Sequence, residues 1–127
     1  MTYTTGLTAS KALKEAGIEV ETEKYWQEIM SEYKWTGEFK LAIKNDLPIN
    51  ISNTRVFPSP SLSELSEVFR VLGEKKGWGE RLLSNPYKVS AKAMEGWLAN
   101  YLDLCNLWAT TQSQERCDEF IISLLTQ

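Results

Sequence analysis

Apolar residues recur at helical spacing in four stretches of the chain and alternate with polar residues in another. The first helical stretch carries Leu13 and several alanines on one face, and Thr8 is its predicted N-cap. Gly17 and Ile18 follow in the order of a Schellman motif, in which a left-handed glycine lets the next apolar residue fold back onto the helix. We therefore expect a helix over residues 8–16.

The clearest helix signal lies in the middle of the chain. Ser61 and Glu64 have the spacing of a capping box, in which each side chain accepts a hydrogen bond from the other residue's backbone N–H group. A stripe of period 3.6 follows, formed by Leu62, Leu65, Val68, Phe69 and Leu72. Gly73 stands just past this stripe, where a C-cap glycine is expected. These features predict a helix over residues 62–72, and a short helical turn through residues 82–83 beyond it.

Three stretches between these two helices have the features of strands. Apolar residues alternate with polar or small ones over residues 39–45, which is the period of a half-buried strand. The aromatic stretch 24–30 and the stretch 49–57, which ends before Pro58, are the other two predicted strands. Because the connections between them are short, we expect them to form an antiparallel sheet.

The last third of the chain contains two more helical stretches, separated by the polar sequence TTQSQ. The first is predicted over residues 91–108, although residues 100–108 also fit a buried strand. The second is predicted over residues 114–125. The sequence therefore predicts an α+β fold in a single domain, residues 1–127, with a small antiparallel sheet of about three strands packed on one side by about four helices.

Composition argues against several classes of function. The chain has 127 residues, of which 43% are hydrophobic and 24% charged, as in ordinary globular domains. A net charge of −3 disfavours generic nucleic-acid binding, which depends on neutralising phosphates. No stretch approaches the ~20 apolar residues of a membrane span, and the first residues lack the pattern of a secretory signal. We expect a cytoplasmic protein in which Cys105 and Cys117 stay reduced.

Catalytic and metal-binding chemistry has little support in the sequence. The chain contains no histidine, which removes the commonest general base and the most adaptable metal ligand. Asp118 and Glu119 are adjacent, but their sequence context gives no reason for a raised pKa. Motifs for phosphate loops, calcium loops and nucleophile elbows are absent. We therefore predict no catalytic residues, no metal ligands and no cofactor.

Basic residues concentrate in residues 70–92, which hold six basic and two acidic side chains, a net charge of +4. Trp78 lies in the middle of this stretch. If its ring is exposed, it would anchor a partner while Lys75, Lys76 and Arg81 meet an acidic group. The alternative is that Trp78 seals the end of the core and the sequence GEKKGWGE only ends a helix.

The stretch 91–108 carries more apolar surface than one helix face needs in so small a domain. Exposed apolar surface often marks an interface, and a closed dimer is the commonest oligomer. The candidate residues of a homo-oligomer interface are Trp97, Tyr101, Leu104, Leu107 and Trp108. The alternative is a central helix that is buried on several faces.

Three stretches resemble small, uncharacterised proteins of phages and prophages: TASKALKEAGIEVETEKYW, FPSPSLSELSEVF and ERCDEFIISLL. The resemblance implies an α+β fold and a mobile-element origin, but it carries over no functional residue, and it is lost between residues 85 and 113. From it we predict a non-catalytic binding protein that recognises a host or phage protein, or a small anionic ligand. A structural or oligomerisation protein and a histidine-free enzyme are the alternatives.

Overall fold

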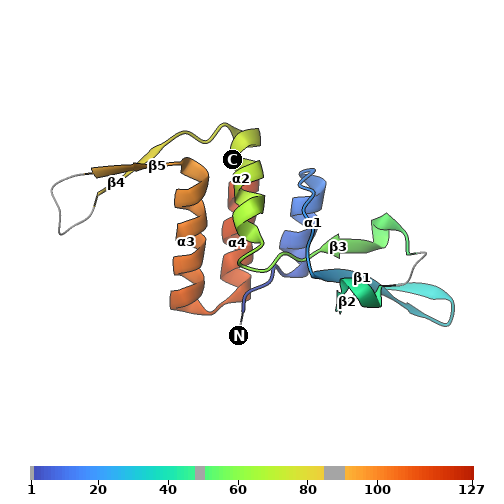
Figure 1. The fold of residues 1–127 in the computed structure, drawn as a ribbon. Coiled ribbons are helices and arrows are strands. Elements are labelled where there is room, and N and C mark those ends of the chain that lie inside the picture. Colours follow the sequence, from blue (N-terminus) through green and yellow to red (C-terminus); the bar gives the residue numbers. More distant parts are fainter. Residues whose placement is uncertain (1, 48–50, 85–90) are drawn as a thin grey trace.

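The computed structural model describes residues 2–47, 51–84 and 91–127 (Figure 1). Its helices are α1 (Leu7–Glu15), α2 (Leu65–Lys76), α3 (Gly96–Thr111) and α4 (Gln114–Leu125). Its strands are β1 (Lys24–Ser31), β2 (Lys34–Ile43), β3 (Val56–Pro58), β4 (Arg81–Ser84) and β5 (Ala91–Met94). The four helices stand together in the middle, the sheet of β1, β2 and β3 lies beyond α1, and the hairpin of β4 and β5 projects from the opposite end.

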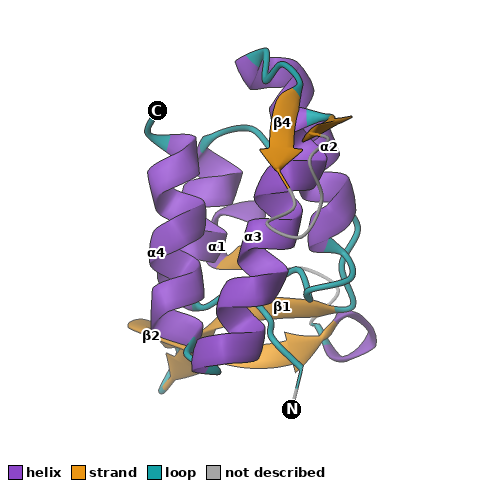
Figure 2. Ribbon diagram, turned by 90° about the vertical axis from the view of Figure 1, so that its left-hand side faces the viewer, coloured by secondary structure: helices purple, strands orange, loops and turns teal. Residues whose placement is uncertain are grey.

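The three-stranded sheet has the order β2-β1-β3, and both strand pairs are antiparallel. Trp26 at its centre pairs with Leu41 on one side and with Phe57 on the other. The turn between β1 and β2 places Glu32 and Tyr33 at positive φ, which matches the twist of a tight hairpin. In the view of Figure 2 the sheet lies across the lower end of the upright helices.

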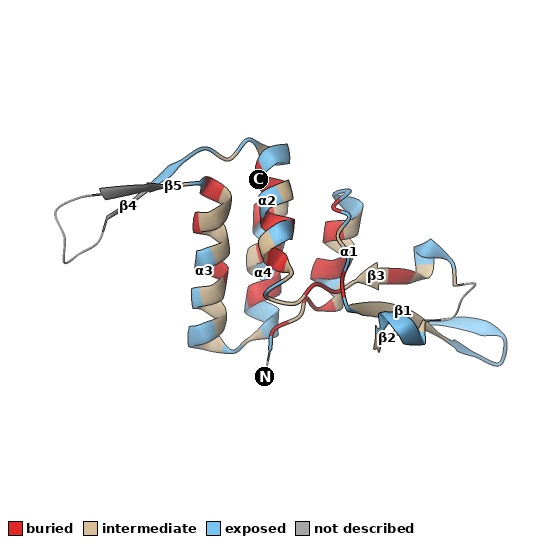
Figure 3. Ribbon diagram, viewed as in Figure 1, coloured by how far each residue is buried: buried red, intermediate tan, exposed pale blue. Residues whose placement is uncertain are grey.

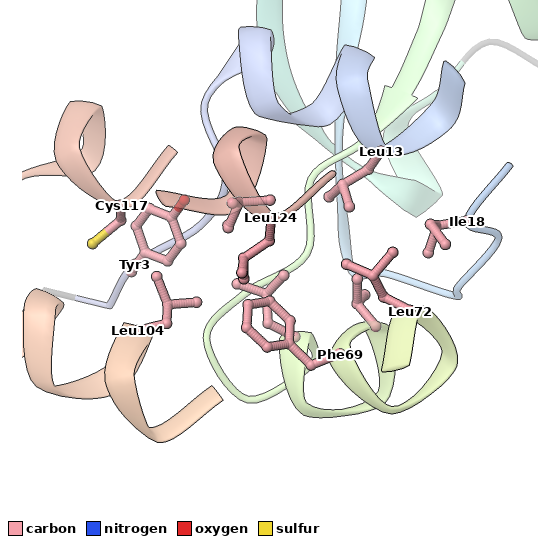
Figure 4. Packing of buried hydrophobic residues seen from close by; sticks show 11 residues of the cluster. Tyr3, Leu13, Ile18, Phe69, Leu72, Leu104, Cys117 and Leu124 are labelled. Atoms are coloured by element: carbon pink, nitrogen blue, oxygen red, sulfur yellow. The ribbon is translucent and has the colours of Figure 1, made fainter. Parts of the chain in front are cut away.

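The hydrophobic core lies among the helices and not over the sheet (Figure 3). Side chains from all four helices converge there, with Leu13 from α1, Phe69 and Leu72 from α2, Leu104 from α3 and Leu124 from α4 (Figure 4). Seven hydrophobic core residues have 0% exposure: Ala9, Leu65, Val68, Phe69, Leu104, Cys117 and Ile121. Most side chains of β1 are only half-buried and most of β2 are exposed.

The predicted α+β class is confirmed, and so are several local signals. Ser61 and Glu64 form the predicted capping box, with N–H···O distances of 2.9 and 3.3 Å. Gly17 has φ +75°, and the N–H of Ile18 bonds to the carbonyl of Leu13 at 3.1 Å, as the Schellman motif requires. Residues 100–108 are helical, which settles the choice left open by the sequence. The N-cap of α1 is Gly6 and not Thr8.

Other predicted boundaries are wrong. The helix predicted over 91–108 begins at Gly96, because residues 91–94 form β5 and pair with β4. The helical turn predicted through residues 82–83 is part of β4. Of the strand predicted over 49–57, residues 53–55 form a 3-10 turn and only the end is a strand, while residues 49 and 50 lie outside the described part.

Candidate binding groove between the end of α2 and the start of α3

The helix α2 ends at Gly77, one turn later than the sequence predicts. Gly77 is left-handed, with φ +65° and ψ +37°. Its N–H bonds to the carbonyl of Glu74 at 3.4 Å, and the N–H of Trp78 bonds to that of Gly73 at 3.0 Å. This is a Schellman motif, so Trp78 folds back onto α2 and its ring lies edge-on to Phe69 at 6.4 Å.

Gly73, which the sequence suggested as the helix cap, lies inside α2, at a position where a side chain would not fit. A Cβ atom at this position would come within 2.7 Å of the Cβ of Trp97 on α3. A Cβ at Gly96, the first residue of α3, would come within 2.3 Å of the carbonyl oxygen of Gly79. The two glycines therefore let the start of α3 approach α2 and the loop after it.

A groove of about 630 Å³ opens at this junction. Its lining residues are Arg70, Gly73, Glu74, Gly77, Trp78, Gly79, Glu80, Glu95 and Trp97. The indole rings of Trp78 and Trp97 are both half-buried and pack against the edge of the hydrophobic core. The groove thus combines two aromatic side chains with three carboxylates and a single guanidinium group.

The groove is lined by more acidic than basic side chains. Its cation, Arg70, bonds to Glu67 at 2.5 Å and to Glu74 at 3.2 Å along the exposed face of α2. Glu95 accepts a hydrogen bond of 2.5 Å from the indole N–H of Trp97. Glu80 lies on the loop and is exposed. Because the carboxylates outnumber the guanidinium, the groove favours a cation over an anion.

The three basic residues predicted to bind a partner point away from this groove. Lys75 donates to the carbonyl of Gly17 at 3.1 Å, just beyond the end of α1. Lys76 donates to the carbonyl of Leu125 at 2.7 Å, at the end of α4. Both lysines thereby lie where the helix dipole favours a cation. Arg81 pairs with Asp103 of α3 at 3.1 Å. Of the four predicted binding residues, the structure places only Trp78 in the groove.

Most of the large apolar residues of α3 are half-buried, and Leu104 is the one that is fully enclosed. Leu104 has 0% exposure within the single chain, so it offers no surface to an oligomer interface. Trp108 packs on Tyr3 with 5.4 Å between ring centroids. The hydroxyl of Tyr101 donates to the carbonyl of Leu62 at 2.8 Å, and burial, with a smaller contribution from the Cys105 thiol, raises the pKa of Tyr101 to about 12. Only Gly96, Ala99 and Leu104 of α3 are buried, so the helix is not enclosed on several faces, and the interface formed by the remaining residues stays a prediction.

Asp118 is a buried charged residue that sequence reasoning missed. Its carboxylate accepts hydrogen bonds from the hydroxyl of Tyr3 at 2.5 Å and from the N–H of Gly6 at 3.1 Å. Gly6 is the N-cap of α1, so the negative charge lies at the positive end of that helix. Asp118 therefore joins α4 to both the N-terminal segment and α1.

The pKa of the Asp118 carboxyl is raised from its ordinary value by burial, while the hydrogen bonds from Tyr3 and Gly6 oppose that shift. Burial also raises the pKa of the Tyr3 hydroxyl and of the Cys117 thiol. The expectation of an unperturbed pKa for Asp118 is therefore wrong. The sequence does carry a signal, because Asp118 shares an i, i+3 face with the apolar Ile121 of α4.

Within residues 2–47, 51–84 and 91–127, no three His, Cys, Asp or Glu side chains come together in a way that would hold a metal ion. In the same residues, every helix is too short or too polar to cross a lipid bilayer. Comparison with models of known protein families, with curated proteins and with solved structures found no match.

Proposed function

We propose that this chain is a non-catalytic binding protein, and that the groove between α2 and α3 receives a basic side chain of a partner protein. The observation that carries the proposal is the composition of the groove lining. It contains two half-buried indole rings and three carboxylates, but only one guanidinium group. The resemblance to phage and prophage proteins makes a host or phage protein the partner class.

The chemistry of the groove supports this choice of ligand. Tryptophan is the aromatic residue that attracts cations most strongly, and it is enriched among residues that dominate binding energy. An arginine side chain is a suitable ligand, because its planar guanidinium stacks on an indole while it bonds to a carboxylate. Glu80 and Glu95 line the groove together with Trp78 and Trp97, and Glu95 accepts a hydrogen bond from the indole N–H of Trp97.

A small anionic ligand fits the groove less well. The prediction of an anionic ligand assumed that the charged groups of Lys75, Lys76 and Arg81 are free to bind it. Their charged groups instead contact backbone carbonyls and Asp103. An anion placed beside Trp78 would meet Glu74 and Glu80 at close range, and like charges in a shared site repel.

The proposal is tested by NMR titration with two blocked peptides, Gly-Arg-Gly-Arg-Gly and Gly-Glu-Gly-Glu-Gly. The indole N–H signals of Trp78 and Trp97, assigned by single substitution to Phe, should move with the arginine peptide and not with the glutamate peptide. The signal of Trp26, which donates to the carbonyl of Thr5 in the sheet, should stay in place. Added salt should weaken binding, because it screens the charges.

A matched pair of variants locates the site. Glu80→Gln removes one groove charge without removing any hydrogen bond described above, and it should raise the Kd for the arginine peptide about threefold, as expected for one partly screened charge pair. Glu115→Gln removes an equally exposed charge from α4 and should leave the Kd unchanged. Equal movement of the indole signals with both peptides, or equal Kd values for the two variants, would refute the proposed site.

A further inference from the structure

The outer edge of β2 presents backbone groups that no described strand occupies. β2 is the last strand on its side of the sheet. The N–H of Lys44 donates to Glu23 at 2.8 Å, and the N–H of Ser59 donates to Lys24 at 2.9 Å. The backbone carbonyl of Glu23, just before β1, therefore faces β2, and that of Lys24, the first residue of β1, faces β3. Because hydrogen-bonded pairs alternate along antiparallel strands, the N–H and C=O groups of residues 39, 41 and 43 point outward.

The side chains at this edge are unusually apolar for an exposed strand. Leu41 is 40% exposed and Ile43 47% exposed, and both lie on the same side of the strand as Phe39. A long edge strand with exposed apolar side chains is a template for pairing with another chain. Its regular outer edge is short, since Gly37 has φ +76° and donates its N–H to the carboxylate of Glu28.

Only some self-pairings of this edge are compatible with its geometry. Pairing centred on Phe39 would need the outward N–H of Gly37, which already bonds to Glu28. Pairing centred on Lys40 would place two lysines directly opposite each other, which is unfavourable. Pairing centred on Leu41 uses only the outward groups of residues 39, 41 and 43.

We propose that β2 pairs in an antiparallel manner with β2 of a second copy of this chain, about a two-fold axis at Leu41. The two sheets then form one continuous sheet with the order β3-β1-β2-β2-β1-β3. In this register Phe39 of each copy lies opposite Ile43 of the other, and Lys40 lies opposite Ala42. Glu38 lies opposite Lys44, the first residue of the 3-10 turn that follows β2, so that two pairs of opposite charges close the ends of the interface. In this register apolar side chains oppose each other on one face of the sheet, and opposite charges oppose each other on the other face. This complementarity is why we propose a second copy of the chain as the partner of this edge.

The first experiment is a cross-linking test of the axis. Opposite residues of a hydrogen-bonded pair have Cα atoms about 5.5 Å apart, within the range that a disulfide spans. Leu41→Cys, in a chain carrying Cys105→Ser to remove the half-exposed native thiol, should form a disulfide-linked dimer of twice 14.5 kDa under mild oxidation. Ile43→Cys in the same background is the matched control. The residues at position 43 of the two chains would lie about 13 Å apart along the strands, so this variant should run as a monomer on a non-reducing gel.

The second experiment tests the charge match without any cysteine. Analytical ultracentrifugation at rising concentration should show a monomer–dimer equilibrium for the natural chain. Glu38→Lys and Lys44→Glu should each weaken the dimer about three- to tenfold in Kd, since each change makes two unfavourable cross-strand pairs. The double variant should recover the natural Kd, which a non-specific contact would not do. A monomer at high micromolar concentration, equal cross-linking at positions 41 and 43, or a double variant as weak as the single ones would overturn the proposal.

Discussion

The helices and the sheet of this protein use their aromatic residues in opposite ways. Phe69 of α2 has 0% exposure and is enclosed by side chains of the other helices. Phe39 of β2 is half-buried, packs on Phe57 at 5.7 Å and has the ammonium group of Lys11 above its ring at 4.7 Å. Because hydrophobic stabilisation follows the apolar area removed from water, the helices hold most of the stability. The sheet leaves apolar surface exposed to solvent, at Leu41 and Ile43 among others.

The largest expected effect compares the same substitution in the two regions. Phe69→Ala should lower the free energy of unfolding by about 3–5 kcal/mol, because it leaves a cavity among the helices. Phe39→Ala should cost only about 1 kcal/mol, because its ring is half in water already. Urea unfolding of both variants measures the difference. Equal losses would mean that the sheet carries as much of the core as the helices do.

A smaller loss of stability is expected when glycines of the two regions are replaced, Gly96 among the helices and Gly37 in the sheet. Gly96→Ala should cost about 1–3 kcal/mol, because its Cβ would meet the backbone of Gly79. Gly37→Ala should cost about 1 kcal/mol through its left-handed backbone alone, since nothing lies within 4 Å of its Cβ position. Asn tolerates that backbone, so Gly37→Asn should be milder than Gly37→Ala, whereas Gly96→Asn should be worse than Gly96→Ala. Thermal unfolding of the four variants separates steric contact from backbone strain, and the same order at both sites would contradict this distinction.

The smallest expected effect is the pH dependence due to Asp118. Its pKa is raised in the fold above the ordinary 3.8, so between the two pKa values the folded state binds more protons than the unfolded state. The stability that this group contributes is therefore present below pH 3.8 and is lost as the pH rises through the folded-state pKa. Asp118→Asn, which keeps an oxygen to accept from Tyr3 and Gly6, should remove this decline.

Unfolding of both proteins across this pH range provides the measurement. Subtracting the variant from the natural chain isolates Asp118 from the other carboxyl groups, because they are common to both. The difference in the free energy of unfolding should fall with rising pH. A difference that rises with pH would show that the hydrogen bonds from Tyr3 and Gly6 outweigh burial.

The sequence predicted those elements whose local pattern and tertiary packing agree. The capping box at Ser61 and the apolar stripe predicted α2, although the helix begins at Leu65 and not at residue 62. The apolar alternation over residues 39–45 predicted the part of β2 next to Trp26, although the strand ends at Ile43 and a 3-10 turn follows. The hairpin of β4 and β5 was missed for a physical reason. Alanine, lysine and methionine in residues 91–94 have high helix propensity, and pairing with β4 overrides it.

The candidate groove could be predicted only in part, because its form depends on contacts between distant segments. Trp78 stood out by its flanking glycines, but nothing local shows that Gly73 must be small to admit Trp97. The partners of Lys75 and Lys76 lie 58 and 49 residues away in the chain, so their cationic groups looked free in the sequence. Because these two lysines contact other parts of the fold, their charges do not line the groove, and acidic side chains predominate there.

The bond between Tyr3 and Asp118 has a consequence for the order of folding. It joins residues that are 115 positions apart, whereas the turn at Glu32 and Tyr33 brings β1 and β2 together locally. The entropy lost on closing a loop grows with the logarithm of its length, so the hairpin should form early and the long closure late. We therefore expect the segment from Tyr3 to Gly6 to reach its place only after α4 has formed. On this expectation, docking of Tyr3 against Asp118 is the last step of folding.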